Sequence, residues 1–483
     1  MRKHFRQQTL GDVFEECKEL FDNDKPRFLQ LLESAVDIGT FIPEAFYNAF
    51  YKRYGRNRLY PLEGFIAALL LQKILSIPSD TLLIVFLKFS KELREFCGFN
   101  KVPDGSKFTR FKQDFGEHIE LMFEQLVDYT EPICREIDAA LAEILIYDTS
   151  GIEAYVKENN PKFINARIKQ LKTYAKSMGF DESYDPYKAA YGSMPSCSVA
   201  DDSVKQMHIN GHFCYAHKFG IVANGLGIVR HIAFFDDAFK NKHPELIIEK
   251  KSDSPDEDKT IGDSSSLQPV LNDFYSRHSA FRSKYRFTTF LGDSSFDKGD
   301  HYTFLKDTCK FKKILIPINQ RNSSSLPPVG YNEYGYPVCP NDKNLAMRRN
   351  GSARGKGRTP RIKWNCPNTR MKSGEYVCSC HNPCSTAKCG RTTYTFDNFD
   401  FRMLPGIVRD SDEWNSLYKH RCAVERSINH FKSNMCVADR KSHNSYTSKA
   451  DLFLAGIAQL FTVVVAKSIN KSIYFRSLKP LVA

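Results

Sequence analysis

The sequence predicts a mixed α/β fold, in which helices cover the faces of a β-sheet, preceded by an all-α N-terminal domain. Three observations support this. Residues 1–135 have the apolar spacing and the capping residues of helices. From residue 136 on, short apolar runs typical of strands alternate with helical segments in the order β, hairpin, α, β, α, β. Residues 323–394 form a basic insertion that interrupts this order of strands and helices; they are poor in apolar side chains and rich in Cys, Gly and Pro.

Length and composition set the scale of the molecule. The chain has 483 residues, of which 42% are hydrophobic; this is enough for a sizeable core and excludes wholesale disorder. The formal charge is +13, from 69 Lys and Arg against 56 Asp and Glu, which favours a polyanionic partner. We expect a helical DNA-binding domain at 1–135, a first part of the sheet domain at 136–322, the insertion at 323–394 and a second, helical part at 395–483.

Capping residues mark the N-terminal helices. Pro61 suits the first turn of a helix over residues 62–75, and Ser79 with Asp80 can cap a second helix that ends near Gly98. A third helix begins near Asp104. It either enters a DNA groove with its basic side or belongs to a plain bundle with solvated lysines. Its apolar face is Phe108, Phe111 and Phe115, and the cations expected to face elsewhere are Lys107, Arg110 and Lys112.

Short apolar runs predict the strands of the sheet domain. The first run, residues 143–148, ends in Asp148, and a hairpin over residues 217–235 turns at Asn224-Gly225. A later strand over residues 286–291 leads to Gly292-Asp293. The remaining predicted elements are a helix at 267–278, a strand at 313–317 and a helical region at 412–468.

The longest apolar stretch, residues 452–466, is interpreted as a buried helix covering the sheet. Gln459 and Thr462 interrupt it, and it is shorter than the roughly 20 residues that a membrane span needs, so no membrane partner is expected. The first five residues are followed by polar residues instead of an apolar segment, which predicts no secretory signal and a cytoplasmic location.

The chain has 14 cysteines, which in a reducing compartment are buried thiols or metal ligands. Six of them lie between Cys339 and Cys389, at spacings short enough to share a tetrahedral Zn²⁺. The alternative is a basic loop with reduced cysteines. Residues 339–394 contain twelve Lys and Arg but only two acids, Asp342 and Glu375. In either case, this segment should bind phosphates in a salt-dependent way. The zinc ligands would be four of Cys366, Cys378, Cys380, Cys384 and Cys389.

Three carboxylates follow elements that a folded sheet can bring together. Asp148 and Asp293 follow strands, and Glu425 lies on the helix after the insertion. Three such oxygen ligands can hold two divalent cations side by side for phosphoryl transfer. The alternative is that each Asp caps the next turn. His217 and His231, on the hairpin, are interpreted as structural. The competing acids are Asp236, which would be the first substitute, and Asp237, Asp297 and Asp300.

The helix around Glu425 presents a set of polar side chains along one edge. Tyr418, Arg421, Glu425 and Lys432 are spaced 3, 4 and 7 residues apart, which places them within an arc of roughly 60°. This set suits a metal ligand flanked by donors to phosphate, or else a solvated charged face. The apolar stripe that would dock the helix on the sheet is Val424, Ile428, Phe431 and Met435.

These motifs resemble those of a known family. Tyr418-x2-Arg421-x3-Glu425-x6-Lys432 matches the YREK signature of bacterial insertion-sequence DDE transposases, spacing for spacing. Asp148-Thr-Ser-Gly151 resembles the first-Asp motif of the family, and Gly292-Asp-Ser-Ser-Phe-Asp297 resembles the second. The similarity covers nearly the whole chain, because the N-terminal region resembles the helical domain before such catalytic cores, in Phe46-Tyr, Gly55-Arg, Leu69-Leu-Leu-Gln72 and Phe108-Thr-Arg-Phe111.

The resemblance implies an RNase H-like core that cleaves transposon ends and joins the 3′-hydroxyls to target DNA. Asp148, Asp293 and Glu425 would bind two Mg²⁺ or Mn²⁺ ions, and Tyr418, Arg421 and Lys432 would hold the transposon end. The implied partners are double-stranded inverted repeats and target DNA, bound by a homodimer at the bacterial nucleoid. The cysteine cluster departs from the plain β-rich insertion of the best-known members.

Two other functions remain open from the sequence. The first is a metal-dependent DNA nuclease without strand transfer. The second is a transposase-derived, zinc-containing DNA-binding protein that no longer catalyses. The presence of all three acids argues against the second.

Overall fold

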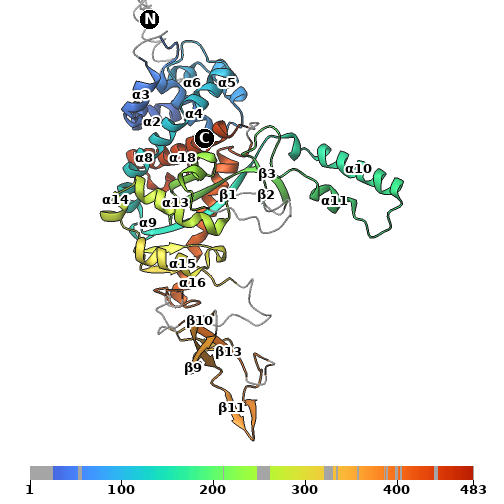
Figure 1. The fold of residues 1–483 in the computed structure, drawn as a ribbon. Helices are drawn as coiled ribbons and strands as arrows, with labels where there is room; N and C mark the ends of the chain where they lie inside the picture. Colours follow the sequence, from blue (N-terminus) through green and yellow to red (C-terminus); the bar gives the residue numbers. More distant parts are fainter. Residues whose placement is uncertain are drawn as a thin grey trace, which may run out of the picture.

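The computed structural model describes residues 26–52, 57–209, 212–246, 261–319, 330–332, 336–355, 358–385, 387, 390–396, 401–402, 405–439 and 444–481. Figure 1 shows the N-terminal helices at one end of an elongated molecule, the β-sheet in the middle and the insertion at the opposite end. The mixed α/β architecture predicted from the sequence is confirmed.

Helices precede the sheet, and two of the predicted caps are present. The side chains of Ser79 and Asp104 accept hydrogen bonds from the backbone N–H of Leu82 (3.2 Å) and Lys107 (3.1 Å). Gly55, part of the N-terminal resemblance, lies outside the described residues. The helices are α2 Arg27–Ala35, α3 Glu44–Phe50, α4 Leu62–Ile74, α5 Asp80–Phe89, α6 Lys91–Phe96, α7 Gly105–Asp114, α8 Gly116–Ile137 and α9 Ala139–Ala142.

The prediction that Lys112 faces away from the core is wrong. Phe108, Phe111 and Phe115 are buried as expected, but Lys112 is only 1% exposed. Its Nζ lies 2.9 Å from a carboxylate oxygen of Asp80 and 3.2 Å from one of Asp451. The reason is that α18 Ser445–Ser468 covers a second side of α7, which a single amphipathic stripe does not reveal.

The central sheet has the strand order β2-β3-β1-β5-β6, with β4 also paired to β3. Strand β3 runs antiparallel to its neighbours, whereas β5 is parallel to β1, and β6 is parallel to β5. The predicted hairpin is confirmed as β3 and β4, and β1 continues five residues beyond the predicted end at Asp148. The strands are β1 Ile144–Glu153, β2 Lys205–Ile209, β3 His212–Asn224, β4 Val229–Phe234, β5 Thr289–Leu291 and β6 Lys313–Leu315.

Helices cover both faces of the sheet. Alternate side chains of a strand point to opposite faces. Tyr147 therefore faces α13 Asp263–Arg277, where its hydroxyl lies 2.6 Å from Ser266 Oγ, whereas Asp148 faces α17 Cys422–Asn429. Shorter helical elements are α12 Asp237–Lys242, α14 Ala280–Ser283, α15 Gly299–Thr303 and the π-helical turn Phe304–Thr308.

Helix α18 is the central helix of the molecule. It is long and apolar enough to cross a membrane by length and composition, but 94% of its most apolar window is buried inside the protein. It packs against α4, α7 and α8 on one side and β4 on the other. The predicted buried helix over residues 452–466 is therefore confirmed.

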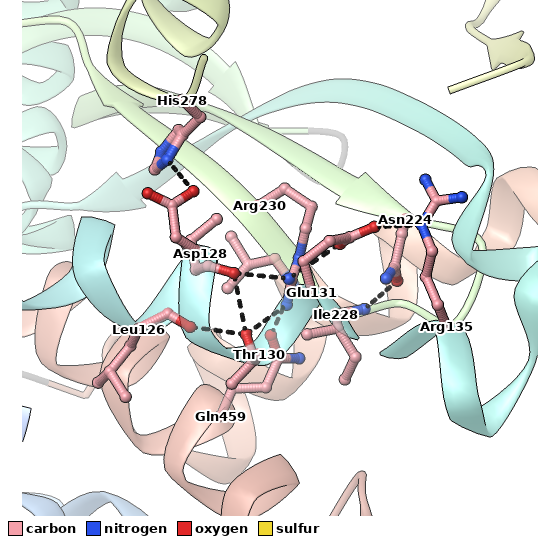
Figure 2. A network of polar contacts seen from close by, with 12 residues as sticks. Leu126, Asp128, Thr130, Glu131, Arg135, Asn224, Ile228, Arg230, His278 and Gln459 are labelled. Carbon is pink, nitrogen blue, oxygen red and sulfur yellow. Dashed lines mark hydrogen bonds and ion pairs between the residues drawn. The ribbon is translucent and has the colours of Figure 1, made fainter. Parts of the chain in front are cut away.

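A buried polar network joins α8 to the sheet (Figure 2). The fully buried Arg230 of β4 lies 3.3 Å from Glu131 and donates to Thr130 Oγ1 (3.2 Å). Burial raises the pKa of Glu131, although the guanidinium groups of Arg230 and Arg135 act in the opposite direction. Because each charge has a partner, this side of the sheet can be buried without an isolated ion.

Two segments extend from this body (Figure 1). The first, between β1 and β2, contains α10 Pro161–Met178 and α11 Pro186–Gly192, which the sequence indicated only as a polar, basic stretch. The second is the cysteine-rich insertion, which is itself β-rich and has a small apolar cluster around Met347 and Trp364. Its strands are β7 Val338–Cys339, β8 Asp342–Ala346, β9 Arg348–Gly355, β10 Arg358–Asn365, β11 Thr369–Lys372, β12 Glu375–Cys378 and β13 Thr392–Phe396.

Candidate active site

Asp148 and Asp293 lie next to each other on the neighbouring segments of β1 and β5, where β5 ends. The parallel strands β1 and β5 pair Ile146 with Leu291, and each Asp follows two residues later. Neighbouring strands lie about 4.8 Å apart, so this register alone brings the two carboxylates together. Asp293 also caps the next turn, as the alternative interpretation supposed, because its Oδ1 accepts from the backbone N–H of Ser295 (2.8 Å).

The Asp148 carboxylate is mostly buried and surrounded by other charges. It accepts a hydrogen bond from the backbone N–H of Thr149 (2.8 Å), and its Oδ2 lies 3.7 Å from Nη2 of Arg421. Burial raises the pKa of Asp148 to about 6. The negative charges of Asp293 and Glu425 contribute to this rise, while Arg421 and the hydrogen bond from Thr149 oppose it. The three predicted acids therefore share one electrostatic environment.

Three of the four predicted side chains on the final helical region meet at this point. Helix α16 Asp412–Tyr418 continues through a 3₁₀ turn, Lys419–Arg421, into α17. A 3₁₀ turn has three residues per turn, which places Tyr418 and Arg421 directly in line. Arg421 forms an ion pair with Glu425, and the Tyr418 hydroxyl donates to the carbonyl oxygen of Gly292 (3.3 Å). Burial raises the pKa of Tyr418 to about 12.

Lys432 does not join this group. It lies on a π-helical turn, His430–Asn434, that follows α17. Such a turn advances fewer degrees per residue than an α-helix. Lys432 is therefore rotated away from the edge that uniform α-helical spacing predicts for all four side chains. Burial lowers the pKa of Lys432, and the titratable neighbour that acts on it is the thiol of Cys214 on β3, not one of the three acids.

Arg421 stands between two of the candidate metal ligands. It contacts both Asp148 and Glu425, and Glu425 is half exposed. In the part of the chain that the structure describes, no three Cys, His, Asp or Glu side chains are gathered closely enough to hold a metal ion. Two of the acids thus flank a guanidinium, while Asp293 lies beside Asp148 at the end of the neighbouring strand, and the described residues form no preformed cation cage.

Polar and backbone contacts that the motifs do not show hold α17 in place. The predicted apolar stripe of α17 is buried, and Ser427 on the same helix accepts a hydrogen bond from Gln459 Nε2 of α18 (3.1 Å). Gln459 also bonds to Gly227 O (3.0 Å) and Val229 N (2.9 Å) in the hairpin. Gly227 has a φ of +82°, and a Cβ there would come within 3.1 Å of the Ala423 carbonyl oxygen. Gln459 could have been noticed in the sequence, because it is a polar residue inside the long apolar stretch 452–466.

The competing acids have other partners. Asp297 is buried and forms two hydrogen bonds with Arg402, at 2.8 and 2.6 Å. Asp236 caps α12 through Phe239 N (2.9 Å) and lies 3.3 Å from Lys449. Asp237 pairs with Lys240 (2.9 Å), and Asp300 is exposed in the first turn of α15. None of the four is among the charges that act on Asp148.

The hairpin histidines are buried. Burial lowers the pKa of His217 to about 4 and that of His231 to about 3. His217 packs against the ring of Phe234 and His231 against that of Phe274. Both positions fit the structural interpretation given to these residues.

In the insertion, two of the predicted cysteines, Cys366 and Cys384, lie near each other and near Cys339, which is not in the predicted set. Burial raises the pKa of Cys384, and Cys339 and Cys366 raise it further. Cys339 and Cys366 are buried. Cys378 lies on β12, and Cys380 Sγ accepts from Asn368 Nδ2 (3.3 Å). Cys389 lies outside the described residues.

One comparison with known proteins supports a role for this chain. Residues 15–114 match a family model described as "Transposase domain (DUF772)", which supports a transposase role. No curated protein matches the chain significantly. Among solved structures, the piggyBac transposase synaptic complex with hairpin DNA is similar at 10% identity and a TM-score of 0.28, over 96% of this chain and 85% of that chain. At that TM-score the likeness supports no further statement.

Proposed function

We propose that the chain is a DDE transposase that cleaves DNA at transposon ends and joins the 3′-hydroxyls to target DNA. The observation that carries the proposal is the convergence of Asp148, Asp293 and Glu425, from three separate elements: Asp293 and Glu425 both act on the charge of Asp148, and Arg421 pairs with Asp148 and Glu425. The match of the N-terminal region to a transposase domain supports it independently. The mixed sheet with helices on both faces is consistent with the RNase H-like core that the YREK resemblance implies.

The acids fit Mg²⁺ or Mn²⁺, because carboxylate oxygens are the ligands that hard cations prefer. Burial raises the pKa of Asp148, with smaller contributions from the charges of Asp293 and Glu425, and a divalent cation would favour the ionised carboxylates. Two bound ions would lower the pKa of an attacking water or 3′-hydroxyl and stabilise the leaving oxygen. Asp148, Asp293 and Glu425 would hold them, and Arg421, next to Asp148, would then donate to a phosphate oxygen.

Tyr418 would position DNA near the acids. Its hydroxyl already lies at the Gly292 carbonyl, one residue before Asp293, and its raised pKa keeps it a hydrogen-bond donor at neutral pH. Lys432 would contact DNA farther along, near Cys214 of β3. We further propose a homodimer assembled on paired transposon ends, whose mass would be doubled in sedimentation experiments with end DNA.

The experiment uses a plasmid carrying the gene's own flanking DNA, purified protein and Mg²⁺ or Mn²⁺. The wild type should cut at inverted repeats and yield joined products, whereas Glu425→Gln and Asp293→Asn should yield neither. Asp300→Asn is the matched control, because it removes an exposed acid on the same segment and should retain full activity. Cleavage without joined products would establish a nuclease instead. DNA binding without cleavage by the wild type would favour the non-catalytic DNA-binding function.

We also propose that the insertion holds Zn²⁺ through Cys366 and Cys384, with Cys339 added to the predicted candidates because it lies near Cys384. Metal analysis of the purified protein should find about one zinc per chain. Cys366→Ser should lose it, whereas Cys197→Ser, which changes a partly buried cysteine outside the insertion, should not. An insertion that is folded without zinc would leave the basic-loop interpretation.

A further inference from the structure

The α10–α11 arm, residues 157–192, extends from the sheet edge into solvent (Figure 1). Its base is well anchored: Asn159 Nδ2 donates to the carbonyl oxygens of Ala154 (2.7 Å) and Tyr215 (2.8 Å), and Asn159 Oδ1 accepts from Tyr215 N (2.7 Å). The two helices are tied together by Lys172 Nζ, which donates to Tyr187 OH (3.0 Å) and lies over its ring. The arm is thus an ordered projection at a fixed place relative to β1.

One face of α10 is a row of lysines. The helix carries five cations and no acidic residue. At 100° per residue Lys162, Lys169, Lys172 and Lys176 fall within an arc of roughly 80°, away from the stripe Ile164, Ile168, Leu171 and Ala175 that is turned toward the protein. These four lysines are exposed, and within the described residues no ion pair joins them to an acid. The row spans about 21 Å at 1.5 Å per residue.

We propose that this lysine face binds the phosphate backbone of double-stranded DNA. A duplex presents about one negative charge per 1.7 Å of its axis, so a row about 21 Å long faces a continuous line of phosphates. Charge argues against a second copy of the arm as the occupant, because two such lysine rows would repel each other.

The arm is connected directly to the candidate active site, since it begins shortly after the end of β1, the strand that carries Asp148. DNA bound along α10 would therefore be held at a constant offset from the three acids. The inference rests on the proposed function in assigning a DNA substrate. It adds a contact surface outside the YREK residues, the N-terminal helices and the insertion.

The test measures binding of the full-length protein to a 40-base-pair duplex over a series of salt concentrations. Lys169→Gln/Lys176→Gln should weaken binding and lower the slope of log K against log salt by about 1.8, which is two lost phosphate contacts at about 0.9 each. The control Lys284→Gln/Lys310→Gln removes the same charge from exposed positions outside the arm and should leave the slope unchanged. Equal thermal unfolding of both variants excludes misfolding as the cause.

Three results would overturn the proposal. The first is an arm variant with the same slope as the wild type. The second is a control variant whose slope falls as much as that of the arm variant, which would indicate a general effect of net charge. The third is self-association that the arm variant abolishes while DNA binding is unchanged, which would make the arm an interface between copies. Failure of the proposed function is distinguishable, because it appears as absent cleavage by a wild type that still binds DNA through the arm.

Discussion

At the scale of single residues, the ionised Asp148 side chain of the candidate site lowers the stability of the folded protein. Its pKa in the folded protein is about 6, against 3.8 for an ordinary Asp. Between these values the folded state binds more protons than the unfolded state, so stability falls as the pH rises from about 4 to above 6. The side chain is only 19% exposed, so this cost is not screened away by solvent. A site in which burial, with smaller contributions from Asp293 and Glu425, disfavours the ionised Asp148 is expected to be stabilised by a bound cation.

We therefore expect Asp148→Asn to be more stable than the wild type in the absence of divalent metal. The difference should grow from less than about 1 kcal/mol at pH 4 to about 3 kcal/mol at pH 8, at about 1.36 kcal/mol per pKa unit. Chemical denaturation at several pH values measures it. Mg²⁺ should stabilise the wild type and not the variant. Parallel stability curves would show that Asp148 titrates normally.

Lys112 provides a second prediction at this scale. Its ammonium group is buried between Asp80 and Asp451, so Lys112→Met removes one cation from both carboxylates, and Asp451 keeps its ion pair with Lys73. Loss of one partner of a buried ion pair costs about 3–5 kcal/mol. Lys107→Met, on the exposed side of the same helix, should change stability by less than about 0.5 kcal/mol. Similar costs for the two variants would contradict the buried network.

At the scale of elements, Gln459 links α18, the hairpin and α17. Gln459→Leu keeps the side-chain volume but leaves Val229 N, Gly227 O and Ser427 Oγ without this partner. Each unsatisfied buried group costs about 1–3 kcal/mol, so we expect a loss of at least about 2 kcal/mol and reduced cleavage. Thr462→Val is the control, since Thr462 bonds only to Ala458 O on its own helix and should cost less than about 1 kcal/mol. A fully active, stable Gln459→Leu would show that α17 is held by its apolar stripe alone.

Some elements could be predicted from the sequence and others could not. The hairpin, α4, α7 and α18 follow from local signals: apolar period, caps and the Asn224-Gly225 turn. The register that places Asp148 beside Asp293 is a long-range pairing that no local pattern contains. Lys432 was misplaced because the spacing assumed one uniform helix, whereas the chain uses a 3₁₀ turn and a π-helical turn. The arm was missed because its helices bury little, so its polar sequence showed only a weak apolar period.

At the scale of the whole molecule, the N-terminal helices and the sheet share one apolar core. Their buried side chains form a single apolar cluster that runs from Phe28 to Leu478. Lys73 of α4 and Lys112 of α7 both pair with Asp451 of α18, so the predicted boundary at residue 135 is not a boundary in packing. The insertion differs, because its cluster around Trp364 is separate.

This division predicts two levels of hydrogen-exchange protection in the full-length protein. Amides of α4, α7 and α18 should exchange through the same global opening, because their charges and apolar side chains are buried together. Lys112→Met should lower the protection of all three helices by the same free energy. Amides of β9 and β10 should exchange earlier and should be unaffected by Lys112→Met, since they do not share that core. If α4 and α7 opened at lower free energy than α18, the N-terminal helices would be an independent domain that is only docked on the sheet, and a transposon end bound there would be free to move relative to Asp148.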